Sequence, residues 1–186
     1  MKSVLISTRP KLVEKICHKI GEDETGNAIY EKRIEVRNTT PQEVPFKCYI
    51  YETQGQYVKF THGAHTKYGY GRGKVIGWFV CNLVDEYPYD YCDGVDIDDD
   101  TILETAIDRE DINIYAKGKT LYGWHISDLK IYNNPRELSE FFKPCDRFLD
   151  CCTCRRLVHN EYMSCDNKIT RPPLSWCYVE DLGEEE

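Results

Sequence analysis

The chain has 186 residues, a length that suits one domain with its own hydrophobic core better than two domains. Its 41% hydrophobic and 30% charged residues exclude an extended disordered chain. A net charge of −8 excludes a protein that coats nucleic acid through bulk electrostatic attraction. The charge is uneven, because residues 1–82 carry 13 Lys/Arg against 8 Asp/Glu and residues 83–186 carry 11 against 24. We therefore expect a basic face on the first half and an acidic flank on the second.

No segment of the sequence is long and apolar enough to cross a bilayer. The longest apolar run is Val75 to Cys81, far below the roughly 20 residues that a span needs. The first residues turn polar at once and lack the apolar stretch of a signal peptide. We expect a cytoplasmic protein, whose 10 cysteines stay reduced rather than form a disulfide framework.

The first half of the chain predicts one helix and three strands. The helix begins at Pro10, repeats apolar residues at helical spacing and ends near Gly21. The polar segment 21–30 is expected to be a loop. The predicted strands are Lys2–Ser7, Lys32–Arg37 and Phe46–Thr53.

The second half predicts further strands and a short second helix. Residues 54–73 and 85–100 are expected to be loops, and the helix runs from Asp108 to Gly118. The predicted strands are Lys74–Val84, which is apolar on both faces, Thr120–Tyr132 and Ser175–Leu182.

This order of elements predicts an α+β fold in which the strands close into a small mixed β-barrel. The whole chain, 1–186, is expected to be one domain. Residues 143–170 form an inserted cysteine-rich loop in this interpretation, and residues 183–186 form an acidic tail.

Four short motifs, in this order, resemble the ASCH domain, a relative of the PUA RNA-binding domains. The family signature Gly-x-Lys-x-x-Glu-x-Arg is matched at Lys32, Glu35 and Arg37, with Tyr30 in place of the glycine. The other three motifs resemble bacterial and phage-borne members of the family. They span residues 7–11, 122–129 and 172–180.

The resemblance implies a cleft that holds a nucleotide or an exposed RNA base. Glu35 and Arg37 alternate along one strand, so both are expected to point into the same space. Arg37 offers a fork of donors for a phosphate or a base edge, and Trp124 offers a stacking surface. The alternatives are an internal ion pair that only orders the fold and a tryptophan that belongs to the core. The candidate RNA- or nucleotide-binding residues are Lys11, Lys32, Glu35, Arg37, Trp124 and His125.

We favour a binding module over an enzyme. One branch of the family that the chain resembles hydrolyses the amide of a modified cytidine with a lysine and, three residues later, a threonine. Here the residue three after Lys32 is Glu35, which cannot act as that nucleophile. A ribonuclease that uses the same cleft is one alternative. A phage accessory protein that binds a host protein through its acidic face is another.

A cluster of cysteines near the end of the chain predicts a zinc site. Thiolates gathered this closely in a reduced compartment usually bind zinc, and four of them leave no position for a catalytic water. Cys152 is a spare that can replace Cys151, and free surface thiols are the alternative. The predicted ligands of a structural Zn²⁺ are Cys145, Cys151, Cys154 and Cys165.

Overall fold

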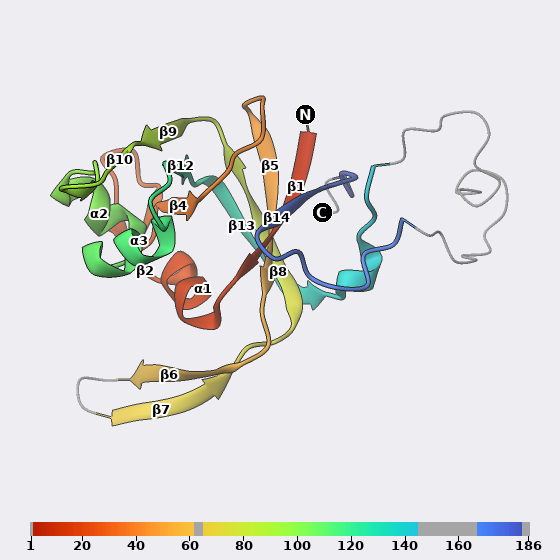
Figure 1. The fold of residues 1–186 in the computed structure, drawn as a ribbon. Coiled ribbons are helices and arrows are strands. Elements are labelled where there is room, and N and C mark those ends of the chain that lie inside the picture. Colours follow the sequence, from red (N-terminus) through yellow and green to blue (C-terminus); the bar gives the residue numbers. More distant parts are fainter. Residues whose placement is uncertain (1, 62–64, 145–166, 184–186) are drawn as a thin grey trace, which may run out of the picture.

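The computed structural model describes residues 2–61, 65–144 and 167–183 (Figure 1). The elements are β1 (Lys2–Thr8), α1 (Pro10–Cys17), β2 (Lys19–Glu22), β3 (Ala28–Tyr30), β4 (Ile34–Arg37), β5 (Phe46–Glu52), β6 (Gln56–Thr61), β7 (His65–Tyr70), β8 (Lys74–Cys81), β9 (Val84–Tyr87), β10 (Tyr89–Asp90), β11 (Gly94–Val95), α2 (Asp99–Thr105), α3 (Arg109–Ala116), β12 (Leu121–His125), β13 (Ser127–Arg136), the 3-10 helix η1 (Leu138–Glu140) and β14 (Trp176–Val179).

A five-stranded mixed sheet forms the centre of the molecule, in the order β13-β8-β5-β1-β14. β1 runs parallel to β5 and antiparallel to β14, and the other pairs are antiparallel. β5 is buried along its whole length, and β8 along most of it, which fits their position in the middle of the sheet. The amphipathic helix α1 packs Val13 and Ile16 against one face of this sheet.

A smaller sheet, in the order β4-β12-β9, lies beside the large one. One face carries Trp124 into the core cluster that the large sheet and α1 share. The other face packs Ile34, Val36 and Leu121 against Ile112 of α3 and its surroundings. Figure 1 shows α2 and α3 grouped at this end of the molecule. The small sheet is therefore covered on both faces.

The mixed α+β class is confirmed, but the prediction of a closed barrel is wrong for the described part of the chain. Its strands form separate ladders, and none joins β4 to β1 or β14. Side chains bridge this gap instead. Arg37 of β4 donates to the backbone oxygens of Ser7 and Ser175, and Trp176 Nε1 donates to Thr39 Oγ1 at 2.9 Å.

Two predicted loops are hairpins. Residues 21–30 lie in the β2–β3 hairpin, whose turn is organised by Asp23. Hydrogen bonds from the Thr25 hydroxyl and the Asn27 backbone lower the pKa of Asp23 to about 2. Residues 54–73 contain the β6–β7 hairpin, which projects from the body below α1 in Figure 1.

The helices differ from the prediction at two points. α1 ends at Cys17 rather than near Gly21, because the chain turns there into β2. The predicted second helix is α3, and an additional helix, α2, precedes it. The Asp98 side chain caps α2 by accepting from Thr101 N. No helix in the described ranges has the length and hydropathy required to cross a membrane.

Candidate functional site

Glu35 and Arg37 lie between the two sheets, on the face of β4 that points toward the large sheet. The intervening residue, Val36, packs on the opposite face, because successive strand residues alternate. Arg37 Nη2 lies 2.8 Å from Glu35 Oε1. The two residues expose only 3% and 6% of their surface, so this ion pair is buried.

Arg37 also holds the small sheet to the edge of the large one. Its Nη2 donates to Ser7 O at 3.1 Å and to Thr8 Oγ1 at 3.3 Å, and its Nη1 lies 3.4 Å from Ser175 O. The segment before β14 is fixed over this position, because Ser7 Oγ donates to Pro173 O at 2.6 Å. Arg37 thus combines an ion pair with a structural role at the gap between the sheets.

Lys32 has no exposed surface, and its ammonium group is held by backbone carbonyls. Lys32 Nζ donates to Ile34 O at 2.7 Å and to Thr105 O at 2.8 Å, and it lies 3.4 Å from Glu35 Oε2. Burial lowers the pKa of Lys32, and the attraction of Glu35 partly opposes that shift. Since Thr105 is the last residue of α2, Lys32 anchors that helix to β4.

Trp124 lies directly opposite Glu35 in the β4–β12 ladder, so the two side chains share a face. The indole ring is fully buried and makes edge-on contacts with Phe46 and Trp176, at centroid distances of 5.0 and 5.9 Å. Both faces of the Trp124 ring are therefore packed within the core. Trp176 is partly buried and lies at the rim of the gap between the sheets.

The other two candidates lie apart from this group. His125 follows Trp124 and takes the opposite face of β12, where its Nε2 lies 2.7 Å from Asp85 Oδ2. Lys11 is exposed on α1. The structure therefore brings together Lys32, Glu35, Arg37 and Trp124, and it adds Ser175 and Trp176. Ser175 and Trp176 were not among the predicted site residues, although both lie in the motif at residues 172–180.

Several buried polar atoms of this group have no hydrogen-bond partner within the described residues. They are Glu35 Oε2, Arg37 Nε, Trp124 Nε1 and Ser175 Oγ, and the two others of this kind are Ser3 Oγ and Thr40 Oγ1. A buried polar atom without a partner costs free energy, so native proteins keep few of them. Four of these six atoms belong to the residues gathered at the gap between the sheets. This group, Lys32, Glu35, Arg37, Trp124, Ser175 and Trp176, is hereafter called the inter-sheet site.

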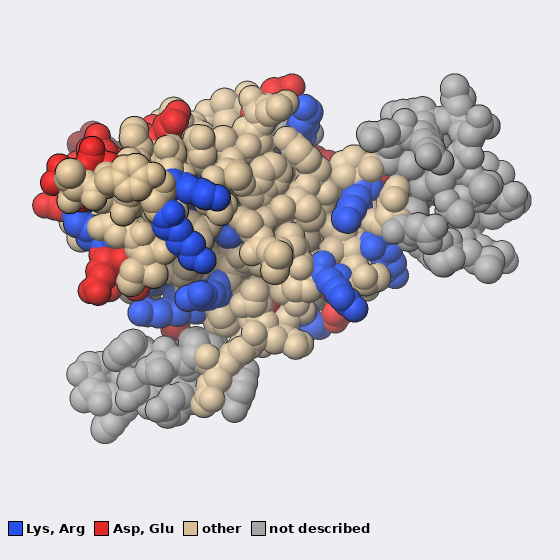
Figure 2. Space-filling view, in the orientation of Figure 1, with Lys and Arg blue, Asp and Glu red and all other residues tan. Residues whose placement is uncertain are grey.

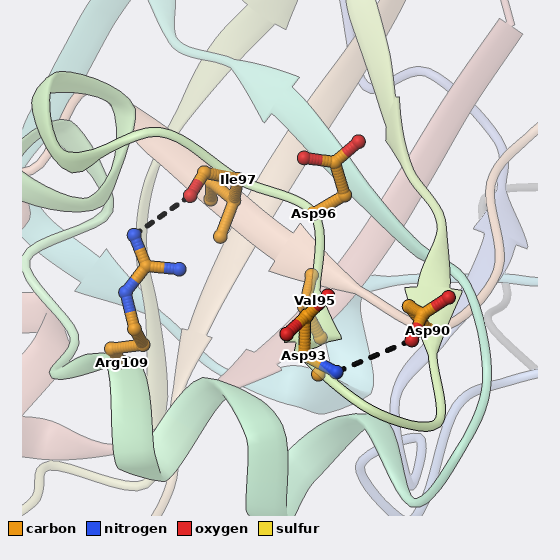
Figure 3. A pocket seen from close by; sticks show the side chains of 7 residues that line it. Asp90, Asp93, Val95, Asp96, Ile97 and Arg109 are labelled. Atoms are coloured by element: carbon orange, nitrogen blue, oxygen red, sulfur yellow. Dashed lines mark hydrogen bonds between the residues drawn. The ribbon is translucent and has the colours of Figure 1, made fainter.

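A separate pocket of about 390 Å³ lies at the acidic end of the molecule (Figure 3). Arg109 of α3 lies at one side of this pocket and donates to Ile97 O and to Asp99 Oδ1, both at 2.8 Å. The pocket is also lined by carboxylates, which disfavour a phosphate-bearing ligand. These are Asp90, Asp93 and Asp96.

Charge is segregated on the face shown in Figure 2. Acidic side chains gather over the α2–α3 end, whereas basic side chains lie over α1 and near η1. The uneven charge of the two halves of the sequence is therefore also a division in space.

The four predicted zinc ligands, Cys145, Cys151, Cys154 and Cys165, lie outside the described residues. The described ranges contain no cluster of three or more His, Cys, Asp or Glu residues that is suited to a metal ion. Cys48 and Cys81 are buried in the core, and burial raises the pKa of the Cys81 thiol to about 12.

Comparison with known proteins identifies the fold. The crystal structure of ASCH from Zymomonas mobilis superposes with a TM-score of 0.51 at 15% sequence identity, over 96% of this chain and 88% of that chain. The chain has the ASCH fold. The fold implied by the four motifs is thus confirmed.

Structures of two mutants of the same Zymomonas protein match this chain to a similar extent. A tyrosine-to-phenylalanine mutant matches with a TM-score of 0.52 at 14% identity, over 97% of this chain and 91% of that chain. A serine-to-alanine mutant matches with a TM-score of 0.51 at 14% identity, over 96% and 89%. No protein-family model and no curated protein sequence matches the chain.

Proposed function

We propose that this ASCH-fold protein is a binding module that recognises RNA, or a nucleotide, at the inter-sheet site. The observation that carries the proposal is the concentration of buried polar atoms without a hydrogen-bond partner on Glu35, Arg37 and Trp124, of which Glu35 Oε2 also lies 3.4 Å from Lys32 Nζ in an ion pair. One is a carboxylate acceptor and two are N–H donors. A base edge presents the complementary donors and acceptors, so a bound nucleotide satisfies all three.

The charge of the site supports an anionic ligand. Two cationic side chains, Lys32 and Arg37, surround the single carboxylate of Glu35. With Lys32 protonated, the buried group carries one net positive charge, which a phosphate neutralises. With Lys32 neutral, the group still presents Arg37 Nε, which has no hydrogen-bond partner among the described residues.

The gap between β4 and the edge of the large sheet is the proposed route for the ligand. Only side-chain bonds from Arg37 and Trp176 cross this gap in the described residues, so opening it breaks no β-ladder. The segment at 173–175 covers Arg37, and Leu174 within it is fully exposed. A shift of this segment uncovers the site without unfolding either sheet.

The contacts of Lys32 favour binding over catalysis. Its ammonium group already donates to two carbonyl oxygens, and the carboxylate of Glu35 is paired with Arg37. Each group is already engaged with partners inside the fold, so neither is positioned primarily to accept a proton from a substrate. We therefore expect no hydrolysis of an acetylated cytidine.

We expect wild-type protein to bind nucleoside monophosphates and a short single-stranded RNA, measured by calorimetry and by fluorescence anisotropy. Glu35→Gln and Arg37→Lys each keep size but weaken a charge-assisted contact, so each is expected to lower affinity by about 1–3 kcal/mol. Glu110→Gln is the matched control, since Glu110 is exposed on α3, an element that contributes no residue to the site.

Binding that is indifferent to both substitutions, in variants whose circular dichroism and melting match wild type, contradicts the inter-sheet site. Cleavage of the RNA by wild-type protein, lost in Glu35→Gln, supports the ribonuclease alternative instead.

A further inference from the structure

The five-stranded sheet carries a second buried cation, on the face opposite to the inter-sheet site. Lys47 of β5 exposes only 3% of its surface. Its neighbour Cys48 belongs to the core cluster shared with α1, whereas Tyr49 belongs to the cluster on the other face. Because strand residues alternate, the Lys47 side chain lies on the same face as Tyr49. A lysine is rarely buried unless it is paired, so the groups around it indicate what this position accommodates.

The partner of this lysine is a single carboxylate oxygen that receives three donors. Asp181 Oδ1 lies 3.1 Å from Lys47 Nζ, accepts from the Tyr49 hydroxyl at 2.6 Å and accepts from Gly183 N at 3.3 Å. The segment 181–183, which follows β14, therefore rests on β5 through contacts that converge on one anionic oxygen. Convergent charge-assisted donors of this kind are the surroundings that an oxyanion prefers.

Two aromatic rings and a second lysine extend this group across the sheet. Lys47 Nζ lies 4.3 Å from the ring centroid of Trp78 and 5.2 Å from that of Tyr49. Lys130 Nζ lies 5.0 Å from the Trp78 centroid. Trp78 pairs with Tyr49 in one ladder and with Lys130 in the next, so the three side chains share one face. Since Lys130 is exposed, positive charge reaches the surface beside the buried lysine.

A buried hydroxyl on this face has no partner. Ser3 of β1 lies directly opposite Lys47 in the β1–β5 ladder, so the two side chains point to the same side of the sheet. Ser3 is 3% exposed, and its Oγ lacks a hydrogen-bond partner among the described residues. The carboxylate of Asp181 thus leaves one nearby donor unused. A phosphate group has more oxygens than a carboxylate, so it offers an additional acceptor for this hydroxyl.

The contact with Asp181 can be released while the sheet stays intact. The β1–β14 ladder ends at Val179, two residues before Asp181. Beyond this point the chain is held to β5 at Lys47 and at Tyr49, whose hydroxyl accepts from Leu182 N at 3.1 Å. The Asp181 side chain is 39% exposed, so solvent reaches it. An anion from solvent can therefore replace the carboxylate without breaking a ladder.

We propose that Ser3, Lys47 and Tyr49 form a binding site for a phosphate group, and that Asp181 closes this site by placing its own carboxylate there. A free phosphate ion and a phosphate of an RNA backbone share this chemistry. Only the identification of RNA as the source rests on the proposed function. The site itself is independent of the inter-sheet site, because the two lie on opposite faces of the large sheet.

Removing the carboxylate of Asp181 tests the site. Asp181→Ala opens it, and Asp181→Asn keeps the size of the side chain while removing its charge. Asp181→Ala/Lys47→Gln shows whether the effect depends on the lysine. Asp111→Ala is the control of equal charge, since Asp111 is exposed on α3, an element that contributes no residue to the site. The probes are inorganic phosphate, measured by calorimetry, and a fluorescein-labelled single-stranded RNA, measured by anisotropy over a range of salt.

We expect Asp181→Ala to bind inorganic phosphate about tenfold more tightly than wild type, the effect of about one charge-assisted hydrogen bond. With RNA, the slope of log affinity against log salt is expected to steepen by about 0.7, the contribution of one phosphate contact to a single strand. Over the decade from 1 M to 0.1 M salt this equals a gain of about fivefold at 0.1 M. Asp181→Asn is expected to show a smaller gain, and the double variant and Asp111→Ala are expected to match wild type.

A gain with inorganic phosphate alone supports the site with a free anion as its ligand, and a gain with RNA as well supports a backbone phosphate. Absence of a gain with either probe in folded Asp181→Ala and Asp181→Asn overturns the site. An equal gain in Asp111→Ala, which indicates net charge alone, or a gain that persists in the double variant also overturns it. Adding Glu35→Gln to Asp181→Ala separates the two proposals, because the gain is expected to remain even if the inter-sheet site binds nothing.

Discussion

At the scale of single residues, the protein buries three charged side chains at positions where apolar side chains would cost less free energy. Removing an ion from water costs several kcal/mol, and a buried ion pair often contributes little net stability. Lys32, Glu35 and Arg37 nevertheless lie together with almost no exposed surface. Hydrogen bonds to backbone carbonyls compensate much of this cost for Lys32 and Arg37. The buried polar atoms that still lack a hydrogen-bond partner indicate that the arrangement is suited to a ligand.

Lys32 is expected to be important for stability. Lys32→Ala leaves the carbonyls of Ile34 and Thr105 without their donor and removes a cation from Glu35, so we predict a loss of about 3–5 kcal/mol in the free energy of unfolding. Urea denaturation followed by circular dichroism measures it. Lys11→Ala, on the exposed face of α1, is expected to change stability by less than about 0.5 kcal/mol. Equal stability of the two variants contradicts the anchoring role of Lys32.

Sequence alone predicts part of this site, for a definite reason. Glu35 and Arg37 alternate along a strand, so their shared face follows from the period of a strand. The contact of Lys32 with Thr105 depends on a helix 73 residues further along, which was not predicted. The opposition of Trp124 and Glu35 depends on the register of two strands that are distant in sequence. Such long-range geometry is set by packing, which local patterns do not specify.

At the scale of elements, strands with continuous apolar content were predicted well, and short polar elements were not. β1 and β5 lie within one residue of their predicted bounds. β8 begins at the predicted Lys74 but ends at Cys81, three residues before the predicted end at Val84, where β9 begins. The β2–β3 and β6–β7 hairpins are rich in glycine and polar residues, a composition that favours loops in isolation. Pairing with a neighbouring segment overrides that preference. The predicted barrel does not close, because no ladder among the described residues joins the small sheet to the large one, and side chains bridge the gap at β4.

The base of the β6–β7 hairpin is expected to tolerate no side chain at Gly71. An added methyl group would meet the backbone oxygen of Thr53, so Gly71→Ala must displace the hairpin from Thr53 and from Pro10 at the start of α1. We predict faster amide hydrogen exchange over residues 56–61 and 65–70, with the five-stranded sheet still protected. Gly21→Ala is the control, because a methyl group there contacts nothing within 4 Å. Identical exchange in both variants shows that the hairpin is not held at Gly71.

At the scale of the whole molecule, the acidic end and a basic surface at the start of α1 lie on different parts of the protein. The α2–α3 end carries the pocket lined by Asp90, Asp93 and Asp96, whereas Arg9 and Lys11 are exposed at the start of α1. A polyanion is repelled from the first region and attracted to the second, so the charge distribution orients an approaching strand. The net charge alone conceals this, since it sums the two regions.

The described residues that flank the cysteine-rich segment pair with each other. Lys143 N donates to Asn167 O at 2.8 Å, Ile169 N donates to Phe141 O at 2.9 Å, and Phe142 pairs with Lys168. The chain therefore leaves and returns as adjacent antiparallel segments. Phe141 and Ile169 belong to the core cluster of the large sheet, so the stem is part of the body.

We propose that the segment beyond this stem binds one structural Zn²⁺ through Cys145, Cys151, Cys154 and Cys165. Elemental analysis of protein purified without chelator is expected to find about one zinc per chain. Cys154→Ser is expected to lose the metal, whereas Cys152→Ser, which changes the spare cysteine, is expected to retain it. Because the stem is closed by its own hydrogen bonds, loss of zinc should leave the main thermal transition in place and increase proteolysis only beyond residue 144. Protein without stoichiometric zinc refutes the site, and a collapse of the main transition in Cys154→Ser shows instead that the metal stabilises the whole fold.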